Sequence, residues 1–109
     1  MAAGRQIELP DGRQADFALR LDSDEGEPYI ARGSTVYVQI APPGDGDVGL
    51  FLYDGRIILR QYCADWAGNI HLLCLNRARS REDIVVTGDR RLLYFGRLSL
   101  NWRPPLPEF

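Results

Sequence analysis

The sequence contains no lysine, and all 13 of its basic side chains are arginines. A guanidinium stays protonated at any working pH, so no basic side chain here can act as a neutral amine base. There is a single histidine, His71, and there are two cysteines, Cys63 and Cys74. This set and its spacing match no zinc site, and glycine patterns typical of nucleotide binding are missing too. We therefore expect no metal and no cofactor.

Long apolar runs are also missing, so no segment reaches the roughly 18 residues that a membrane span requires. The N-terminal residues lack the apolar core of a secretion signal, which makes the cytoplasm the expected location. The formal net charge is −2. A nucleic-acid-binding surface usually carries a basic excess, so the chain alone is a poor candidate for binding DNA. We expect Cys63 and Cys74 to be buried free thiols, with a disulfide across a hairpin as the alternative.

What the sequence has in abundance is short strand-like runs separated by turns. A length of 109 residues fits one domain. The absence of a 3.6-residue apolar stripe predicts little helix. Asp54-Gly55 is a strong signal for a two-residue hairpin turn, and we expect a polar loop at 76–83. The sequence predicts a mainly β fold with about seven short strands, at 17–21, 35–40, 48–53, 57–63, 70–75, 83–86 and 92–98.

The residues from Phe17 to Val38 read FALRLDSDEGEP, then YIARGS, then TVYV. This stretch resembles, without a gap, the catalytic loop of the C-terminal domain of LexA and phage repressors, commonly F-A-L-R-V-x-G-D-S-M-E-P. That family consists of self-cleaving serine–lysine peptidases and shares its mainly β fold with signal peptidases. The resemblance places Glu25 at the position of the nucleophilic serine and Gly26 at the position of the methionine.

A second stretch, from Asp54 to Gln61, resembles the family hairpin that ends in the general-base lysine. Arg60 falls at or next to that lysine position. Weaker likenesses follow at 75–77 and at 95–98, so the resemblance covers about 85 of the 109 residues. It implies a LexA-like fold in which both members of the catalytic dyad are lost, because the dyad needs a hydroxyl nucleophile and a neutral amine. We therefore expect a protein that is not an enzyme.

The two substitutions are consistent with each other. A lone arginine at a buried lysine position would leave an unpaired charge in apolar surroundings. We therefore expect Glu25 and Arg60 to form an ion pair in place of the dyad. The alternative is that both side chains simply face water.

The sequence also offers other candidate catalytic sites and a candidate cation site. A shifted alignment makes Ser23 the nucleophile, and a triad of His71 with Ser23 or Ser34 is a further alternative. A lone strand histidine is more often packed or solvated. The acidic run at 22–27 suggests a cation site, but it lacks the ligand order of an EF-hand.

The resemblance also implies an organisation and a function. Residues 1–15, with Ala3-Gly4, resemble the family's cleavage region, residues 16–100 the C-terminal domain, and 101–109 a flexible proline-rich tail. We expect a piece of a longer bacterial transcription regulator, in which this domain is a non-catalytic, dimerising part. DNA would be bound only through an upstream domain, and a RecA-type co-regulator is a further expected partner. Candidate dimer contacts are Leu92, Leu93, Tyr94, Phe95 and Trp102.

Two alternatives remain. One is an active self-cleaving peptidase. The other is a stand-alone β-barrel module that binds nucleic acid or peptide through a basic patch of Arg77, Arg79, Arg81, Arg90, Arg91 and Arg97. The tail Arg103–Pro107 resembles a polyproline ligand, although a disordered terminus is the more ordinary interpretation.

Overall fold

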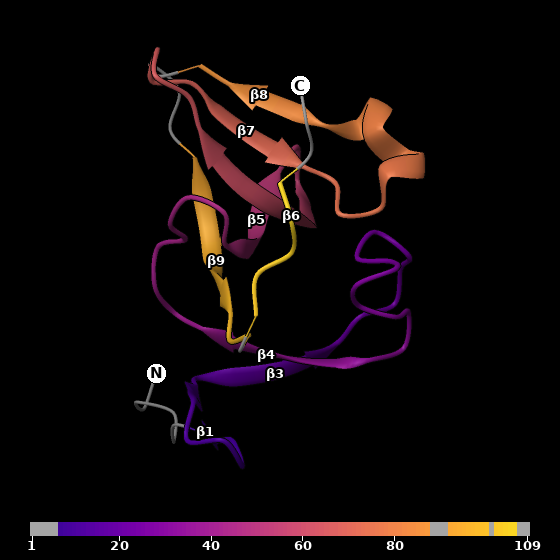
Figure 1. Ribbon diagram of the computed structural model, residues 1–109, viewed down its shortest axis with the longest axis vertical. Helices are drawn as coiled ribbons and strands as arrows, with labels where there is room; N and C mark the ends of the chain where they lie inside the picture. Colours follow the sequence, from indigo (N-terminus) through magenta and orange to yellow (C-terminus); the bar gives the residue numbers. More distant parts are fainter. Residues whose placement is uncertain (1–6, 88–91, 101, 107–109) are drawn as a thin grey trace.

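Seven strands form one antiparallel sheet in the order β3-β4-β9-β5-β6-β7-β8. The computed structural model describes residues 7–87, 92–100 and 102–106. Figure 1 shows β3 and β4 at one end of the molecule, and β6, β7 and β8 at the other. The strands are β3 (Phe17–Arg20), β4 (Thr35–Gln39), β5 (Val48–Tyr53), β6 (Arg56–Ala64), β7 (Ile70–Leu73), β8 (Ile84–Val86) and β9 (Leu93–Leu98). The predicted mainly β architecture is confirmed.

The hairpin of β5 and β6 is the longest continuous pairing, from Val48 opposite Gln61 to Tyr53 opposite Arg56. Its turn, Asp54-Gly55, has φ values of 53° and 75°. Positive φ at both central positions is the type I′ requirement that the sequence predicts. This turn sets the register of β6, and with it the position of Arg60.

Gly96 allows β9 to lie between β4 and β5. A Cβ atom at this position would lie 2.4 Å from the carbonyl oxygen of Gln39 on β4. No side chain can occupy that space, so the close approach of the two strands requires glycine. β9 is bulged against β5 between the Leu50 and Phe51 pairs.

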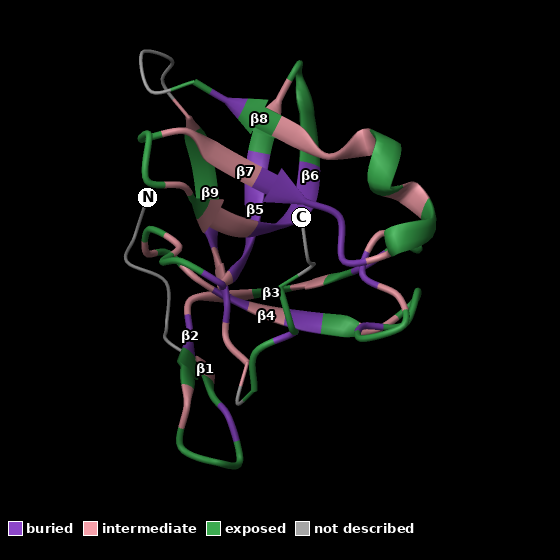
Figure 2. Ribbon diagram, turned by 45° about the horizontal axis from the view of Figure 1, so that its top comes forward, coloured by how far each residue is buried: buried purple, intermediate pink, exposed green. Residues whose placement is uncertain are grey.

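Two apolar clusters form the core. Figure 2 shows buried residues running through β5 and β6. One cluster joins β3 and β4 to β5, β6 and β9, and contains Leu21, Ile30, Val36, Val38, Val48, Leu50, Leu59, Leu75 and Leu98. The other lies on β5 to β8 and contains Phe51, Ile58, Leu72 and Val86. β5 supplies both clusters because alternate side chains of a strand point to opposite faces.

The N-terminal region folds more than the sequence predicts. Within 1–15, β1 (Ile7–Glu8) and β2 (Gln14–Ala15) form a separate two-stranded hairpin. Ala15 is buried, and the Arg13 guanidinium donates to the carbonyl of Ser99. The hairpin is thus held to the main sheet. Ala3-Gly4 lies outside the described residues.

A short 3₁₀ helix, η1 (Arg77–Glu82), replaces most of the polar loop expected at 76–83. The side chain of Asn76 caps it by accepting a hydrogen bond from the Ala78 amide. Such capping by asparagine satisfies an otherwise unpaired N–H group.

Among the described residues, none of the helical structure has the length and apolar character that a membrane-spanning helix requires.

The C-terminal segment contacts the sheet. Over residues 102–104 the expected flexible tail is instead attached to the sheet. Pro104 is buried, and its carbonyl accepts a 2.7 Å hydrogen bond from the Gln61 side chain on β6. Arg103 pairs with Asp47 at 3.0 Å. Figure 1 shows this yellow segment returning from β9 toward β6. Gln61, itself buried, and Asp47 thus hold this segment.

Candidate functional site

Glu25 and Arg60 form the predicted ion pair. Arg60 Nη1 lies 2.8 Å from Glu25 Oε1, and the two side chains are 4% and 14% exposed. The predicted pairing is therefore confirmed, and the alternative in which both side chains face water is wrong. Arg60 comes from the middle of β6, whereas Glu25 comes from the loop between β3 and β4. The pair thus joins two segments 35 positions apart in the sequence.

Glu25 is held at both of its carboxylate oxygens. Oε1 also accepts from the Leu59 amide at 3.0 Å, and Oε2 accepts from the hydroxyl of Ser23 at 2.6 Å. Arg60 donates further to the Leu59 carbonyl. Its Nε is buried and has no hydrogen-bond partner among the described residues. Among the described residues, Glu25 is the carboxylate that forms an ion pair with the buried Arg60 side chain.

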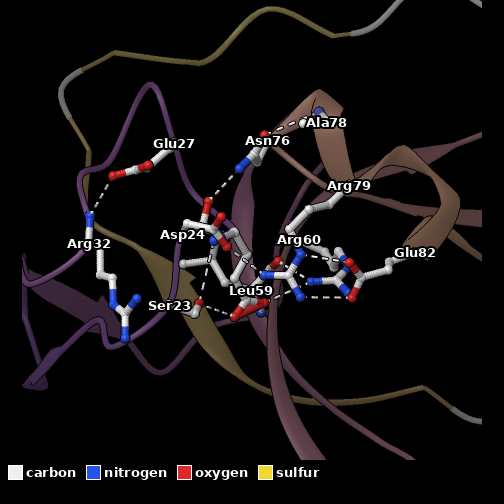
Figure 3. Close-up of polar contacts among 11 residues, drawn as sticks. Ser23, Asp24, Glu27, Arg32, Leu59, Arg60, Asn76, Ala78, Arg79 and Glu82 are labelled. Carbon is white, nitrogen blue, oxygen red and sulfur yellow. Dashed lines mark hydrogen bonds and ion pairs between the residues drawn. The ribbon is translucent and has the colours of Figure 1, made fainter.

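A second set of polar contacts fixes the same loop from the side of η1 (Figure 3). Arg79 bridges Asp24, at 2.9 Å, and Glu82, at 2.6 Å. The hydrogen bond between Arg79 and Glu82 raises the pKa of the guanidinium and lowers the pKa of the carboxyl. Asn76 adds two hydrogen bonds. Its side-chain Nδ2 donates to the backbone carbonyl of Asp24, and its backbone N–H donates to the backbone carbonyl of Glu25. The loop is thus anchored to both β6 and η1.

An open groove runs beside the ion pair. Its volume is about 350 Å³, and both Ser23 and Glu25 line it. Most of the other lining side chains are apolar and come from β3, the residue after it, β5 and β6, namely Leu19, Leu21, Leu50, Ile57 and Leu59. A largely apolar groove with a few convergent polar groups is the usual form of a binding site.

The groups in this groove do not form a serine–amine dyad. The Ser23 hydroxyl donates to the Glu25 carboxylate, not to an amine. The cation paired with Glu25 is the Arg60 guanidinium, which is already protonated and cannot accept a proton from a serine. His71 lies on β7, and its side chain pairs with Asp65 rather than with Ser23 or Ser34. Its Nε2 lies 2.9 Å from Asp65 Oδ2. Ser34 lies in the turn before β4, where its amide donates to the Ala31 carbonyl.

The acidic run makes several separate contacts rather than one cluster. Asp24 and Glu25 pair with different arginines, Asp22 lies 3.9 Å from Arg20, and Glu27 accepts from the Arg32 amide. Within the described ranges, no group of three or more histidine, cysteine or acidic side chains is arranged to hold a metal ion. The acidic residues are used to hold the loop in place.

Three of the six arginines of the predicted basic patch make side-chain pairs. Arg77 pairs with Asp83 at 3.0 Å, and Arg79 with Asp24 and Glu82. Arg97 bonds to Gln39 and lies 3.9 Å from Asp47. Arg90 and Arg91 lie outside the described residues. Arg81, the fourth described member of the patch, is exposed. Paired arginines have less charge to offer to phosphates.

The candidate dimer residues separate into three places. Leu93, Tyr94 and Phe95 are consecutive exposed residues of β9, while Leu92 packs against the second core cluster. The rings of Trp102 and Tyr29 are in contact, with centroids 6.1 Å apart. β9 pairs with β4 only at Arg97 and Leu98. Among the described strands, the edge of 93–95 that faces away from β5 thus has no partner.

Both cysteines are free thiols, as predicted, although only Cys74 is fully buried. Burial is the main factor that raises the pKa of each thiol above its ordinary value. A raised pKa leaves less of the reactive thiolate at neutral pH. Cys63 is directly opposite His71 in the β6–β7 register.

Comparison with known proteins leaves the family open: neither a scan of protein-family models nor a search of curated proteins found a match to this chain. The resemblance to the LexA and phage-repressor domain therefore remains a prediction.

Proposed function

We propose that the chain is a non-catalytic, LexA-like regulatory and dimerisation domain of a bacterial transcription regulator. The observation that carries this proposal is the Glu25–Arg60 ion pair. It joins the two segments in which the resemblance puts the catalytic serine and lysine. A peptidase dyad needs a hydroxyl and a neutral amine within hydrogen-bond reach. A carboxylate and a guanidinium at 2.8 Å supply neither.

The dimer part of the proposal is supported by β9. Two copies could pair the open edge of 93–95 across a two-fold axis, burying Leu93, Tyr94 and Phe95 of both. These side chains are 47%, 44% and 39% exposed in the single chain. An unprotected apolar strand edge is a template for association. In this proposal DNA contact comes from an upstream domain, and the protein acts in the cytoplasm, where a RecA-type partner is a further candidate.

Light scattering coupled to size-exclusion chromatography tests the dimer. The wild-type chain should elute with twice the monomer mass, and Leu93→Asp should elute as a monomer because it places a charge in the interface. Val85→Asp, at an exposed apolar residue of β8, is the matched control and should remain dimeric. A monomeric wild-type chain would contradict this part of the proposal.

A separate incubation tests the loss of catalysis. The family self-cleaves at alkaline pH, whereas this chain should keep its intact mass under the same conditions, with and without Ser23→Ala. A specific cut that Ser23→Ala abolishes would support the alternative of an active peptidase that uses the shifted serine.

A further inference from the structure

The turn between β6 and β7, residues 65–69, carries the most exposed large apolar side chain of the described residues. Trp66 is 99% exposed. Figure 1 shows this turn at the end of the molecule opposite β1. An indole is among the side chains that contribute most to cores and interfaces when it is buried. Here it adds almost nothing to the stability of the single chain, and both faces of its ring are open to a partner.

Hydrogen bonds of Asp65 hold this turn in shape. Asp65 Oδ1 accepts from the amides of Ala67 and Asn69, both at 2.9 Å. The Asp65 amide donates to the Asn69 carbonyl at 2.9 Å, and Asp65 Oδ2 lies 2.9 Å from His71 Nε2. The backbone on both sides of Trp66 is therefore fixed before any partner binds. A contact residue on a preorganised segment loses less conformational freedom on binding than one on a flexible loop.

Two carboxylates give the region around this turn a negative potential. Asp45 is exposed, and its Oδ1 accepts at 2.9 Å from the amide of Ala64, which precedes the turn. Asp65 directly precedes Trp66. Burial is the main factor that raises the pKa of the Cys63 thiol, and the charges of Asp45 and Asp65 raise it further. Both carboxylates thus act on this end of β6.

An open indole beside carboxylates is suited to a cation. The face of an aromatic ring is negative, and tryptophan is the aromatic side chain that attracts cations most strongly. A guanidinium can stack flat on the ring while its N–H groups face a carboxylate. Nucleic acids and anionic lipids present phosphates, which the same carboxylates repel.

We propose that the β6–β7 turn binds an arginine-rich segment of a partner protein, through the indole of Trp66 and the charges of Asp45 and Asp65. The inference goes beyond the proposed function, because it depends on neither the dimer surface on β9 nor the loss of catalysis.

The test titrates the protein with an acetylated, amidated peptide of four arginines and follows the indole N–H signals by NMR. The chain has two tryptophans, so the signal of Trp102 is an internal control. The peptide should shift the signal of Trp66 saturably and leave that of Trp102 in place. A peptide of four citrullines, which has nearly the same shape without the charge, should shift neither. Added salt should weaken the binding.

Two variants assign the contributions. Asp45→Asn removes a charge but keeps an oxygen for the Ala64 amide, and it should weaken binding about two-fold or more, as expected for exposed opposite charges. Asp22→Asn is the matched control, because this exposed carboxylate lies in the loop after β3; it should bind like wild type. Trp66→Leu removes the ring and should weaken binding about two- to five-fold, as measured at the amide signal of Gly68.

Three results would overturn the proposal: no saturable shift of Trp66, an equal shift with the citrulline peptide, or equal binding by wild type and Asp45→Asn. Phosphatidylglycerol vesicles and a single-stranded oligothymidylate should leave the Trp66 signal in place. A shift with either would assign the turn to a lipid surface or to nucleic acid instead. A Trp66 signal that moves with protein concentration alone would assign the turn to a second copy of the chain, which also overturns the assignment to a partner protein.

Discussion

Replacing Glu25 by alanine should destabilise the fold strongly. The change removes the charge that faces Arg60, whose side chain is only 4% exposed, and it leaves the Leu59 amide without its acceptor. Breaking a buried pair by removing one partner costs about 3–5 kcal/mol. Total stability of a chain this size is roughly 5–15 kcal/mol, so this loss is a large part of it. Glu25 itself is slightly exposed, which places the expected loss nearer the lower limit.

Urea denaturation followed by circular dichroism measures the effect. With a slope of about 1–3 kcal/mol per molar urea, the unfolding midpoint should fall by about 1 M or more. Asp22→Ala is the matched control in the same loop. Its 3.9 Å pair with Arg20 is 74% and 89% exposed, so the loss should stay below about 1 kcal/mol. Equal, small shifts for both variants would refute the conclusion that Glu25 compensates a buried charge.

Two further predictions follow from other contacts. Gly96→Ala should destabilise the fold by about 1–3 kcal/mol, because the new methyl group meets the Gln39 carbonyl at 2.4 Å; an unchanged urea midpoint would show that β4 and β9 can move apart. The hydrogen bond from His71 is the main factor that lowers the pKa of Asp65. This carboxyl thus favours the folded state above its ordinary pKa of about 4, and the contribution is lost as the pH falls through the lowered value. His71→Ala should move the Asp65 pKa up toward the ordinary value in an NMR titration, and an unmoved titration would exclude His71 as the cause.

The strands could be predicted because their patterns are local. Alternation and the Asp54-Gly55 turn predict strands at 48–53 and 57–63, and each end lies within one residue of the observed ends of β5 and β6. The hairpin of β1 and β2 could not be found this way, since two-residue strands carry no periodicity. Its place depends on Arg13 reaching Ser99, a contact 86 positions away. The attachment of Pro104 likewise depends on one buried glutamine on β6.

At the candidate site, too, some contacts follow from the sequence and others depend on the folded conformation. The resemblance places Glu25 and Arg60 at the two dyad positions, and a buried guanidinium needs an opposite charge. Together these predict the pair. The contributions of the Ser23 hydroxyl and the Leu59 amide depend on the loop conformation, which no residue pattern specifies. The Arg79–Glu82 pair could be predicted from the sequence, since opposite charges three positions apart can meet on a helical turn. The sequence analysis predicts a loop at 76–83 instead of a helical turn, and therefore does not predict this pair.

A double-mutant cycle on Glu25 and Arg60 tests the central claim most directly. Urea melts of Glu25→Leu, Arg60→Met and the double variant give the energy that couples the two side chains. If the pair is a buried replacement of opposite charges, the double variant should recover most of the stability lost by Glu25→Leu, with a coupling energy above about 1.5 kcal/mol. Losses that simply add, with coupling near zero, would contradict the account.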